Sequence, residues 1–147
     1  MGFESVTVKT IEDIKVGDRA CYAKTVTEAD VMMFAQLSGD YAPQHVSKAF
    51  GETTMFHSRI AHGMLTVGLV GPVLTQICGD ASRTVFQNIR FRSVVLLNDT
   101  VQVTGTVTEV NPTENLVTIE VVCERPDRKE DERPFITAVF QQSLNLE

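Results

Sequence analysis

The sequence predicts an α+β fold in which one antiparallel sheet wraps around one buried helix. The stretch HGMLTVGLVGPVLTQICGD, residues 62–80, carries apolar side chains on every side over about four turns, as a buried helix does. Four segments rich in β-branched residues follow it, separated by turns that contain Asn, Asp or Pro. Because 147 residues is the size of one ordinary domain, we expect residues 1–147 to form a single one.

The first half of the chain contains one predicted strand and one predicted amphipathic helix. Residues 17–26 have a strand pattern after a Gly-Asp turn. Residues 28–37 favour a helix, because Thr27 can cap its N-terminus with Asp30 three positions on, and Gly39 can end it. The predicted apolar face of this helix contains Val31, Phe34, Ala35 and Leu37.

Residues 40–58 are predicted to form a long connection with a short helical turn near residues 46–50. Ordered loops of this length are often functional. In the buried helix, Pro72 lacks a backbone N–H, so we expect a kink or a loosened turn. The later strands are predicted at residues 83–96, 100–110, 116–126 and 134–144, and the charged stretch 125–134 is predicted to be a solvated hairpin loop.

Composition excludes several classes of function. The net charge of −6 and the isoelectric point near 5.0 argue against a general binder of nucleic acids or of acidic membranes, which needs a cationic surface. The apolar run 64–78 is too short to span a bilayer and contains a Gly-Pro pair. The first ten residues hold no apolar core of signal-peptide length, so we expect a soluble cytoplasmic protein.

Cysteine and histidine spacing predicts no metal centre. Cys21, Cys78 and Cys123 are odd in number, widely spaced and set among apolar neighbours, so we expect buried, reduced thiols. Asp40 and the three histidines match no ligand spacing of a known metal site, and His57 is expected at the surface.

Three stretches in order carry a resemblance to a known family: SGDYAPQHVSKAF at residues 38–50, RIAHGML at 59–65 and FRSVVLLNDTVQVTGTV at 91–107. Together they resemble the MaoC-like, R-specific enoyl-CoA hydratase family. In that family a loop reads Ser-Gly-Asp-x-Asn-Pro-x-His, an apolar helix begins with His-Gly-Met, and a strand carries Phe-Arg-x-Pro-Val before Gly-Asp. The resemblance covers roughly residues 15–110. It implies a hot-dog fold, a five-stranded antiparallel sheet around a central helix.

The resemblance also implies an activity. The expected reaction is hydration of a trans-2-enoyl-CoA to the (R)-3-hydroxyacyl-CoA and its reverse, without metal or organic cofactor. By match to the motif, Asp40 and His45 are the expected catalytic pair, since the reaction needs a base for water and an acid for the α-carbon. Gly63, at the expected start of the buried helix, is assigned the role of oxyanion donor through its backbone N–H.

Further residues are expected to contact the acyl-CoA substrate. The phosphates of CoA need cations, for which Lys48, Arg59, Arg90 and Arg92 are candidates, although solvated surface charges are an equal interpretation. His62 is interpreted chiefly as a structural residue that hydrogen-bonds the loop, and also as a substrate contact. The residues expected to bind substrate are Tyr41, Pro43, Phe56, His62, Met64 and Arg90.

The sequence departs from the family pattern at three places. Ala42 replaces the motif Asn, Ser93-Val94 replaces Pro-Val, and Asn98 stands where Gly commonly precedes Asp99. The first change lies in the catalytic loop and concerns rate and substrate. Two alternatives to a hydratase stay open: a hot-dog thioesterase, disfavoured because residues 64–78 contain no carboxylate, and a non-catalytic subunit that binds acyl thioesters, favoured by Ala42.

An exposed sheet edge and an uncovered sheet face are expected consequences of this fold. Pairing with a second copy would cover them, so we expect a homodimer.

Overall fold

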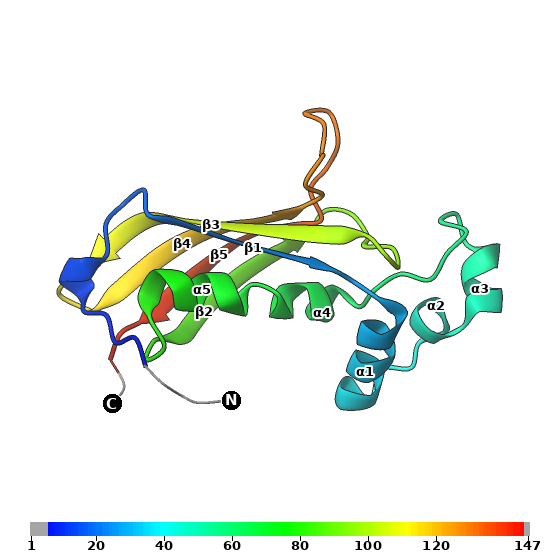
Figure 1. The fold of residues 1–147 in the computed structure, drawn as a ribbon, viewed down its shortest axis with the longest axis horizontal. Helices are drawn as coiled ribbons and strands as arrows, with labels where there is room; N and C mark the ends of the chain where they lie inside the picture. The colour runs from blue at the N-terminus through cyan, green and yellow to red at the C-terminus, as the bar shows by residue number, and fades with distance from the viewer. Residues whose placement is uncertain (1–5, 146–147) are drawn as a thin grey trace.

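In the computed structural model, which describes residues 6–145, five strands form one antiparallel sheet in the order β1-β3-β4-β5-β2. Residues 1–5, which belong to the stretch searched for a signal peptide, and residues 146–147 lie outside the described range. The sheet curves over a helix, and three short helices lie beyond one end of it (Figure 1). The strands are β1 (Arg19–Thr25), β2 (Arg83–Phe91), β3 (Thr100–Asn111), β4 (Leu116–Glu124) and β5 (Ile136–Ser143).

Alternating side chains explain why the sheet has one apolar face. In β3 the residues Val101, Val103, Gly105 and Val107 are buried, and Gln102, Thr104 and Thr106 between them are half-buried, as the sequence pattern predicts. Asn98 and Asn115, in the turns that precede β3 and β4, adopt the left-handed conformation that asparagine tolerates, at φ 68° and 52°. The Asn98 replacement of glycine is therefore compatible with its turn.

Strand β2 follows the central helix in sequence but does not pair with β3, the next strand in the chain. It pairs with β5, so that β2 and β1 form the two edges of the sheet. The other neighbouring strands are also paired antiparallel, and the register of β3 with β4 shifts between Val107 and Glu109. The predicted hot-dog arrangement, a five-stranded antiparallel sheet packed on a central helix, is confirmed.

The central helix is divided into α4 (Gly63–Gly68) and α5 (Gly71–Cys78). Pro72, in the first turn of α5, cannot donate a backbone hydrogen bond to the preceding turn. The intervening N–H groups of Leu69 and Val70 instead donate to carbonyls three residues back, at 3.2 and 3.0 Å. The predicted loosening at Pro72 is confirmed. One side of the helix is not buried, however, because Met64 and Gly68 are exposed and no element of the described chain covers them.

The helices beyond the sheet are α1 (Glu28–Ser38), α2 (Pro43–Val46) and α3 (Lys48–Thr53), and a 3₁₀ turn, η1 (Ile11–Asp13), precedes β1. Thr27 and Asp30 form the predicted capping box of α1, which ends at Gly39 with φ 76°. The prediction that Leu37 belongs to the buried face was wrong: it is 80% exposed, because the core side of α1 carries Val31 and Ala35.

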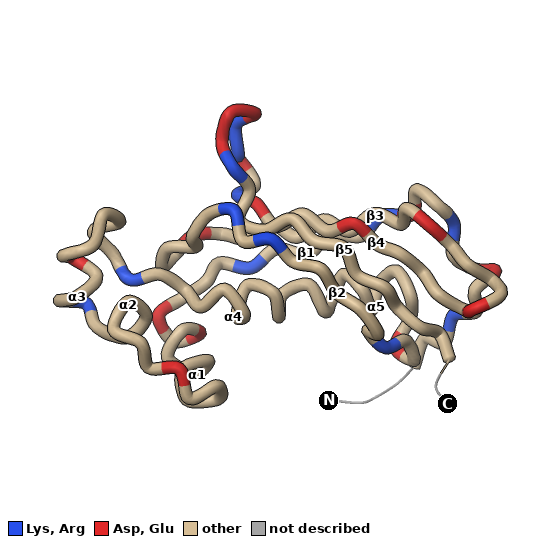
Figure 2. The backbone as a smooth tube through the Cα atoms, turned by 180° about the vertical axis from the view of Figure 1, so that it is seen from behind, with Lys and Arg blue, Asp and Glu red and all other residues tan. Residues whose placement is uncertain are grey.

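The predicted charged loop extends away from the sheet. Figure 2 shows acidic and basic residues mixed along the hairpin between β4 and β5, and most residues of 125–134 are exposed. At its base, Arg125 pairs with Asp99 at 2.8 Å, and Arg128 pairs with Glu124. No helix among residues 6–145 is both long and apolar enough to cross a membrane.

The cysteines differ in environment. Cys78 and Cys123 are buried as predicted, and desolvation raises the pKa of their thiols to about 11 and about 12. The prediction was wrong for Cys21, which is exposed. This residue lies on the edge strand β1, where it faces Thr104 of β3, with 3.6 Å between Sγ and Oγ1.

Candidate active site

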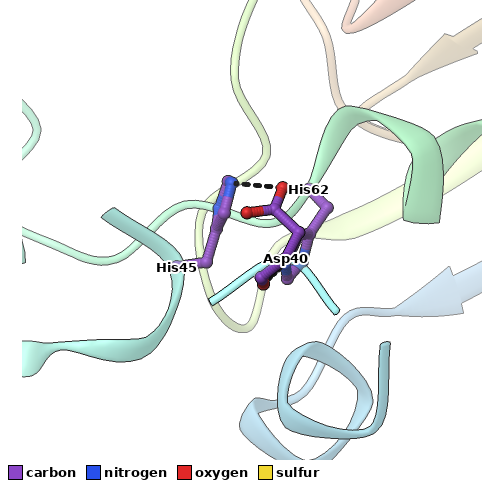
Figure 3. A group of neighbouring side chains, drawn as sticks. All are labelled: Asp40, His45 and His62. Atoms are coloured by element: carbon purple, nitrogen blue, oxygen red, sulfur yellow. Dashed lines mark hydrogen bonds and ion pairs between the residues drawn. The ribbon is translucent and has the colours of Figure 1, made fainter. Parts of the chain in front are cut away.

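The two residues of the predicted catalytic pair lie side by side at the start of α2. Asp40 follows the left-handed Gly39 that ends α1, and His45 lies within α2, whose first residue is Pro43. The Oδ2 atom of Asp40 lies 3.8 Å from the Nε2 atom of His45 (Figure 3). The Asp40 side chain is 52% exposed and the His45 side chain is 7% exposed. The loop therefore presents one accessible acidic group beside one buried histidine.

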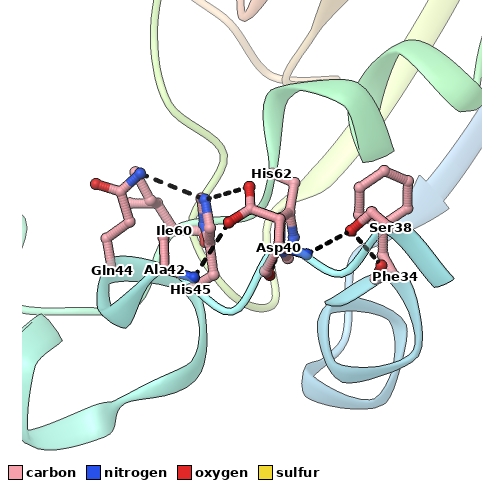
Figure 4. Close-up of polar contacts among 8 residues, drawn as sticks. All are labelled: Phe34, Ser38, Asp40, Ala42, Gln44, His45, Ile60 and His62. Atoms are coloured by element: carbon pink, nitrogen blue, oxygen red, sulfur yellow. Dashed lines mark hydrogen bonds and ion pairs between the residues drawn. The ribbon is translucent and has the colours of Figure 1, made fainter. Parts of the chain in front are cut away.

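Hydrogen bonds with the backbone fix the orientation of both side chains (Figure 4). The Nδ1 atom of His45 lies 2.8 Å from the carbonyl of Ile60, and since a carbonyl only accepts, Nδ1 carries the proton. In neutral His45 the Nε2 atom is then an acceptor, which lies 3.8 Å from Oδ2 of Asp40 and 3.3 Å from the amide nitrogen of Gln44. The Oδ1 atom of Asp40 accepts the N–H of Ala42 at 3.1 Å, so that Oδ2 is the oxygen turned toward His45.

His62 lies directly under this pair and is 2% exposed. Its Nε2–H is donated to the backbone carbonyl of Asp40 at 2.9 Å, as predicted for a residue that hydrogen-bonds the loop. Its ring stacks on that of His45, with 3.9 Å between ring centroids and 26° between planes. Phe34 packs against His62 with 4.9 Å between centroids. The Nδ1 atom of His62 is buried and has no hydrogen-bond partner among the described residues.

A pocket of about 240 Å³ opens at His45 and Gly63. Gly63 is the first residue of α4, where backbone N–H groups have no partner within the helix. A Cβ atom at this position would lie 2.7 Å from the ring of Phe91, so the close approach of the phenyl ring requires glycine. The apolar wall of the pocket includes Phe91, Val94, Val95, Phe135 and Ile136.

Four other residues predicted to bind substrate are exposed and lie outside the lining of this pocket. Tyr41 and Pro43 are exposed on the catalytic loop, and Phe56 is exposed beyond α3. Met64 is exposed at the start of α4. None of these four is among the residues that line the described pocket.

The candidate cations are not gathered at the pocket. Arg59 is 9% exposed and pairs with Glu28 of α1 at 2.6 Å, which makes it a structural ion pair. Arg90 lines a different concavity of about 360 Å³ on the sheet surface, and Arg92 donates to Thr137 at 3.2 Å. Lys48 is exposed at the start of α3.

Sequence reasoning missed two contacts of the reacting groups. The amide nitrogen of Gln44 lies 3.3 Å from Nε2 of His45, and the carbonyl of Ile60 fixes the tautomer of the same ring. Gln44 was visible only as the variable position of the motif. Ile60 acts through its backbone, which no residue type reveals.

The cluster of Asp40, His45 and His62 brings three ligand-type atoms within 4.8 Å of one another. Imidazole binds a metal ion in the plane of its ring at about 2 Å from nitrogen. The rings of His45 and His62 are stacked, with 3.9 Å between centroids and 26° between planes, so their in-plane nitrogen lone pairs do not face each other. The contacts that the structure shows within this cluster are hydrogen bonds and ring stacking.

Comparison with known proteins places this chain among proteins of related sequence and fold. A family model described as "MaoC like domain" matches residues 13–125. An (R)-specific enoyl-CoA hydratase of Rhodospirillum rubrum is 40% identical over 124 residues, covering 84% of this chain and 86% of the relative. A 3-hydroxybutyryl-CoA dehydratase of Methylorubrum extorquens is 35% identical over 113 residues, covering 76% of this chain and 72% of the relative.

Solved structures agree with the sequence comparison. An R-hydratase from Pseudomonas aeruginosa, in unliganded form, superposes with a TM-score of 0.83 at 28% identity, covering 94% of this chain and 86% of the other. Since the family model covers most of the chain and the motif residues meet in one site, this protein belongs to the MaoC-like domain family.

Proposed function

We propose that this protein is an R-specific enoyl-CoA hydratase, which adds water reversibly to a trans-2-enoyl-CoA and forms the (R)-3-hydroxyacyl-CoA. The observation that carries the proposal is the facing pair of Asp40 Oδ2 and His45 Nε2, 3.8 Å apart, beside a pocket whose wall includes Gly63. The two relatives whose names give a hydratase and a dehydratase of CoA thioesters support it.

In our proposal one water molecule bridges the two reacting atoms from beside the gap that separates them. With two hydrogen bonds of ordinary length, the angle at the water oxygen is roughly 90°, which one water tolerates. Oδ2 of the ionised Asp40 and the lone pair on Nε2 of His45 both accept protons. The amide of Gln44, which lies 3.3 Å from Nε2 in the structure, gives up that contact when the water takes its place.

The reaction balances on this pair without another reagent. The water oxygen forms a bond to C3 of the enoyl group while one water proton passes to the Asp40–His45 pair. The electrons of the C2–C3 double bond move onto the thioester, which becomes enolate-like. The pair then returns a proton to C2 and regains its starting state. Both transfers occur from the side of the substrate that faces the pair, so hydrogen and hydroxyl add to the same face.

The enolate-like oxygen needs a donor that is already in place. In our proposal the backbone N–H of Gly63 fills this role, because first-turn N–H groups have no helical partner and point along the helix axis. The apolar wall formed by Phe91, Val95 and Phe135 then faces the acyl part of the substrate.

We further propose that the active form is a cytoplasmic homodimer.

One assay separates this function from its alternatives. Hydration of trans-2-butenoyl-CoA removes the conjugated enoyl-thioester absorbance without releasing thiol, whereas a thioesterase releases free CoA. We expect loss of absorbance, no thiol, and an R-configured product on chiral analysis. Thiol release at the same rate would establish a thioesterase. Binding without either change, for CoA and acyl-carrier-protein thioesters alike, would establish a non-catalytic subunit and refute the proposal.

A further inference from the structure

We propose that His62 is a positioning residue that holds both members of the Asp40–His45 pair, an inference that rests on the proposed hydration. The Nε2–H of His62 donates to the backbone carbonyl of Asp40 at 2.9 Å. The ring of His62 stacks on the ring of His45, with 3.9 Å between ring centroids. It is the residue immediately before α4 and is 2% exposed. A buried side chain at the start of the central helix thus reaches both reacting residues.

The bond to Asp40 fastens the catalytic loop to the central helix. Among the described residues, the other hydrogen bonds of Asp40 are local: its N–H donates to Ser38 and its carboxylate accepts from Ala42. The bond from His62 spans 22 positions of the chain. It therefore determines where the half-exposed carboxylate stands relative to the helix and to Gly63.

The stack on His45 restrains the second member. The backbone carbonyl of Ile60 accepts a hydrogen bond from Nδ1 of His45. This bond fixes the rotation of the His45 ring within the ring plane. A face-to-face neighbour 3.9 Å away prevents the ring from tilting out of that plane. Phe34 supports His62 from another direction, at 4.9 Å. The direction of the Nε2 lone pair is thus held by two different contacts.

Packing alone does not explain why residue 62 is a histidine. The Nδ1 atom of His62 is buried with no partner in residues 6–145, and burying an unpaired polar atom disfavours folding. Phenylalanine would stack on His45 without that unfavourable burial. What it lacks is the Nε2–H that binds Asp40. The choice of histidine therefore points to orientation of the pair rather than to packing.

Two variants separate the two contacts. His62→Phe keeps a stacking ring and removes the donor, whereas His62→Gln keeps a donor near the Nε2 position and removes the ring. Each should lower kcat for trans-2-butenoyl-CoA about tenfold, the effect of one lost supporting hydrogen bond or contact, with KM within about twofold of the parent. His57→Asn is the matched control, because His57 is exposed, its side chain bonds the carbonyl of Glu52 outside the site, and its φ of 50° is one that Asn tolerates. It should have parent activity.

Three readouts distinguish positioning from a purely structural role. Added to Asp40→Asn, His62→Phe should cause no further loss, because the contact it removes acts through Asp40. Its unfolding temperature should stay within about 3 °C of the parent, since it also removes a buried unpaired nitrogen. In histidine NMR spectra, the Nδ1 proton of His45 should exchange with water faster in His62→Gln than in the parent.

The outcomes separate this inference from the proposed function. Normal kcat in both His62 variants of an active parent overturns the inference and leaves the hydratase standing. A tenfold loss that recurs in the Asp40→Asn background, or that follows a large fall in unfolding temperature, overturns it in favour of a structural role. If the parent hydrates no enoyl thioester, the proposed function fails. In that case the exchange of the His45 Nδ1 proton with water still tests the inference. Faster exchange in His62→Gln than in the parent supports the positioning of His45 by His62, and an unchanged exchange rate refutes it.

Discussion

Asp40 and His45 are expected to act as one unit, because both face the same gap of 3.8 Å. Asp40→Asn keeps an oxygen for the N–H of Ala42 but removes the negative charge. His45→Ala removes the lone pair. Each change should reduce kcat for hydration at least about a hundredfold, the usual scale for loss of a general acid or base, as followed by enoyl-thioester absorbance.

The double variant provides the control for this interpretation. Because both groups act on one water, Asp40→Asn with His45→Ala should be about as slow as either single variant. Unchanged circular dichroism would show that the fold survives. Near-normal turnover in either single variant would remove the pair from the mechanism.

Ala42 is the residue where this chain departs from the motif within the catalytic loop. It occupies the N-cap position of α2, where no side-chain hydrogen bond is made. An Asn here can accept a backbone N–H, which a methyl group cannot. We expect Ala42→Asn to raise kcat on trans-2-butenoyl-CoA several-fold, the effect of one restored supporting bond.

The neighbouring amide of Gln44 offers the matched comparison, since it contacts His45 at 3.3 Å. If the Gln44 amide has taken over part of the role of the missing Asn, Gln44→Leu should have a lower kcat than the parent. Adding Ala42→Asn to Gln44→Leu should then restore kcat. A fall in kcat of Ala42→Asn, with loss of branched substrates, would show instead that the small Ala42 enlarges the acyl site.

The cysteines give a prediction that follows from burial. Thiolate is the reactive form, and burial raises the pKa of Cys78 to about 11 and of Cys123 to about 12, so both stay protonated below pH 9. Cys21 is exposed. In the native protein at pH 8, a thiol reagent should modify one of the three cysteines rapidly and all three after denaturation. Rapid reaction at Cys78 or Cys123 would contradict their burial.

At the scale of residues, the sequence supports roles tied to local motifs and fails for long-range partners. Asp40 and His45 lie five positions apart in one loop, so their proximity follows from the chain itself. Arg59 was a candidate for binding phosphate, but its partner is Glu28, 31 positions away. Such a pair depends on how α1 docks against the loop, which composition and spacing do not encode.

At the scale of elements, caps and alternation were sufficient for most boundaries. The capping box at Thr27, the end at Gly39 and the loosened turn at Pro72 all appear where the sequence predicts them. Helix α2 was missed, because a four-residue helix has no periodicity to detect. The pairing of β2 with β5 was not predicted either, since strand partners are set by nonlocal packing rather than by strand pattern.

The contact between the central helix and the sheet supplies a prediction about stability. A Cβ atom at Gly105 of β3 would lie 2.5 Å from a methyl group of Val73 in α5. Gly105→Ala therefore overpacks the core and should lower the free energy of unfolding by about 1–3 kcal/mol, measured in urea. Gly68→Ala is the matched control.

In the control, a Cβ atom at Gly68 meets nothing within 4 Å of the described chain. Alanine is the better helix former, so Gly68→Ala should raise the free energy of unfolding by up to about 1 kcal/mol. Both variants need the same protein concentration, because association would change apparent stability. Equal effects of the same sign would contradict the close helix–sheet contact at Gly105.

At the scale of the whole molecule, the helices that carry the catalytic loop lie beyond the end of the sheet rather than on it (Figure 1). The sheet itself ends in two edges, β1 and β2. Residues of β2 are exposed on both faces, and Val85, Phe86 and Phe91 are 43%, 49% and 55% exposed. An exposed apolar edge of this kind is a template for pairing with another strand.

We therefore expect the homodimer to form through β2, by antiparallel pairing of this edge with its copy. A twofold axis places the same strand on both sides of the contact, as antiparallel edge pairing requires. Sedimentation at micromolar concentration should show a dimer. Phe86→Lys, which puts a charge on the apolar edge, should shift the protein to monomers. Ala23→Lys places the same charge on the other edge, where Ala23 of β1 is exposed, and should remain dimeric. A parent that sediments as a monomer would contradict the dimer, and dissociation by Ala23→Lys alone would move the interface to β1.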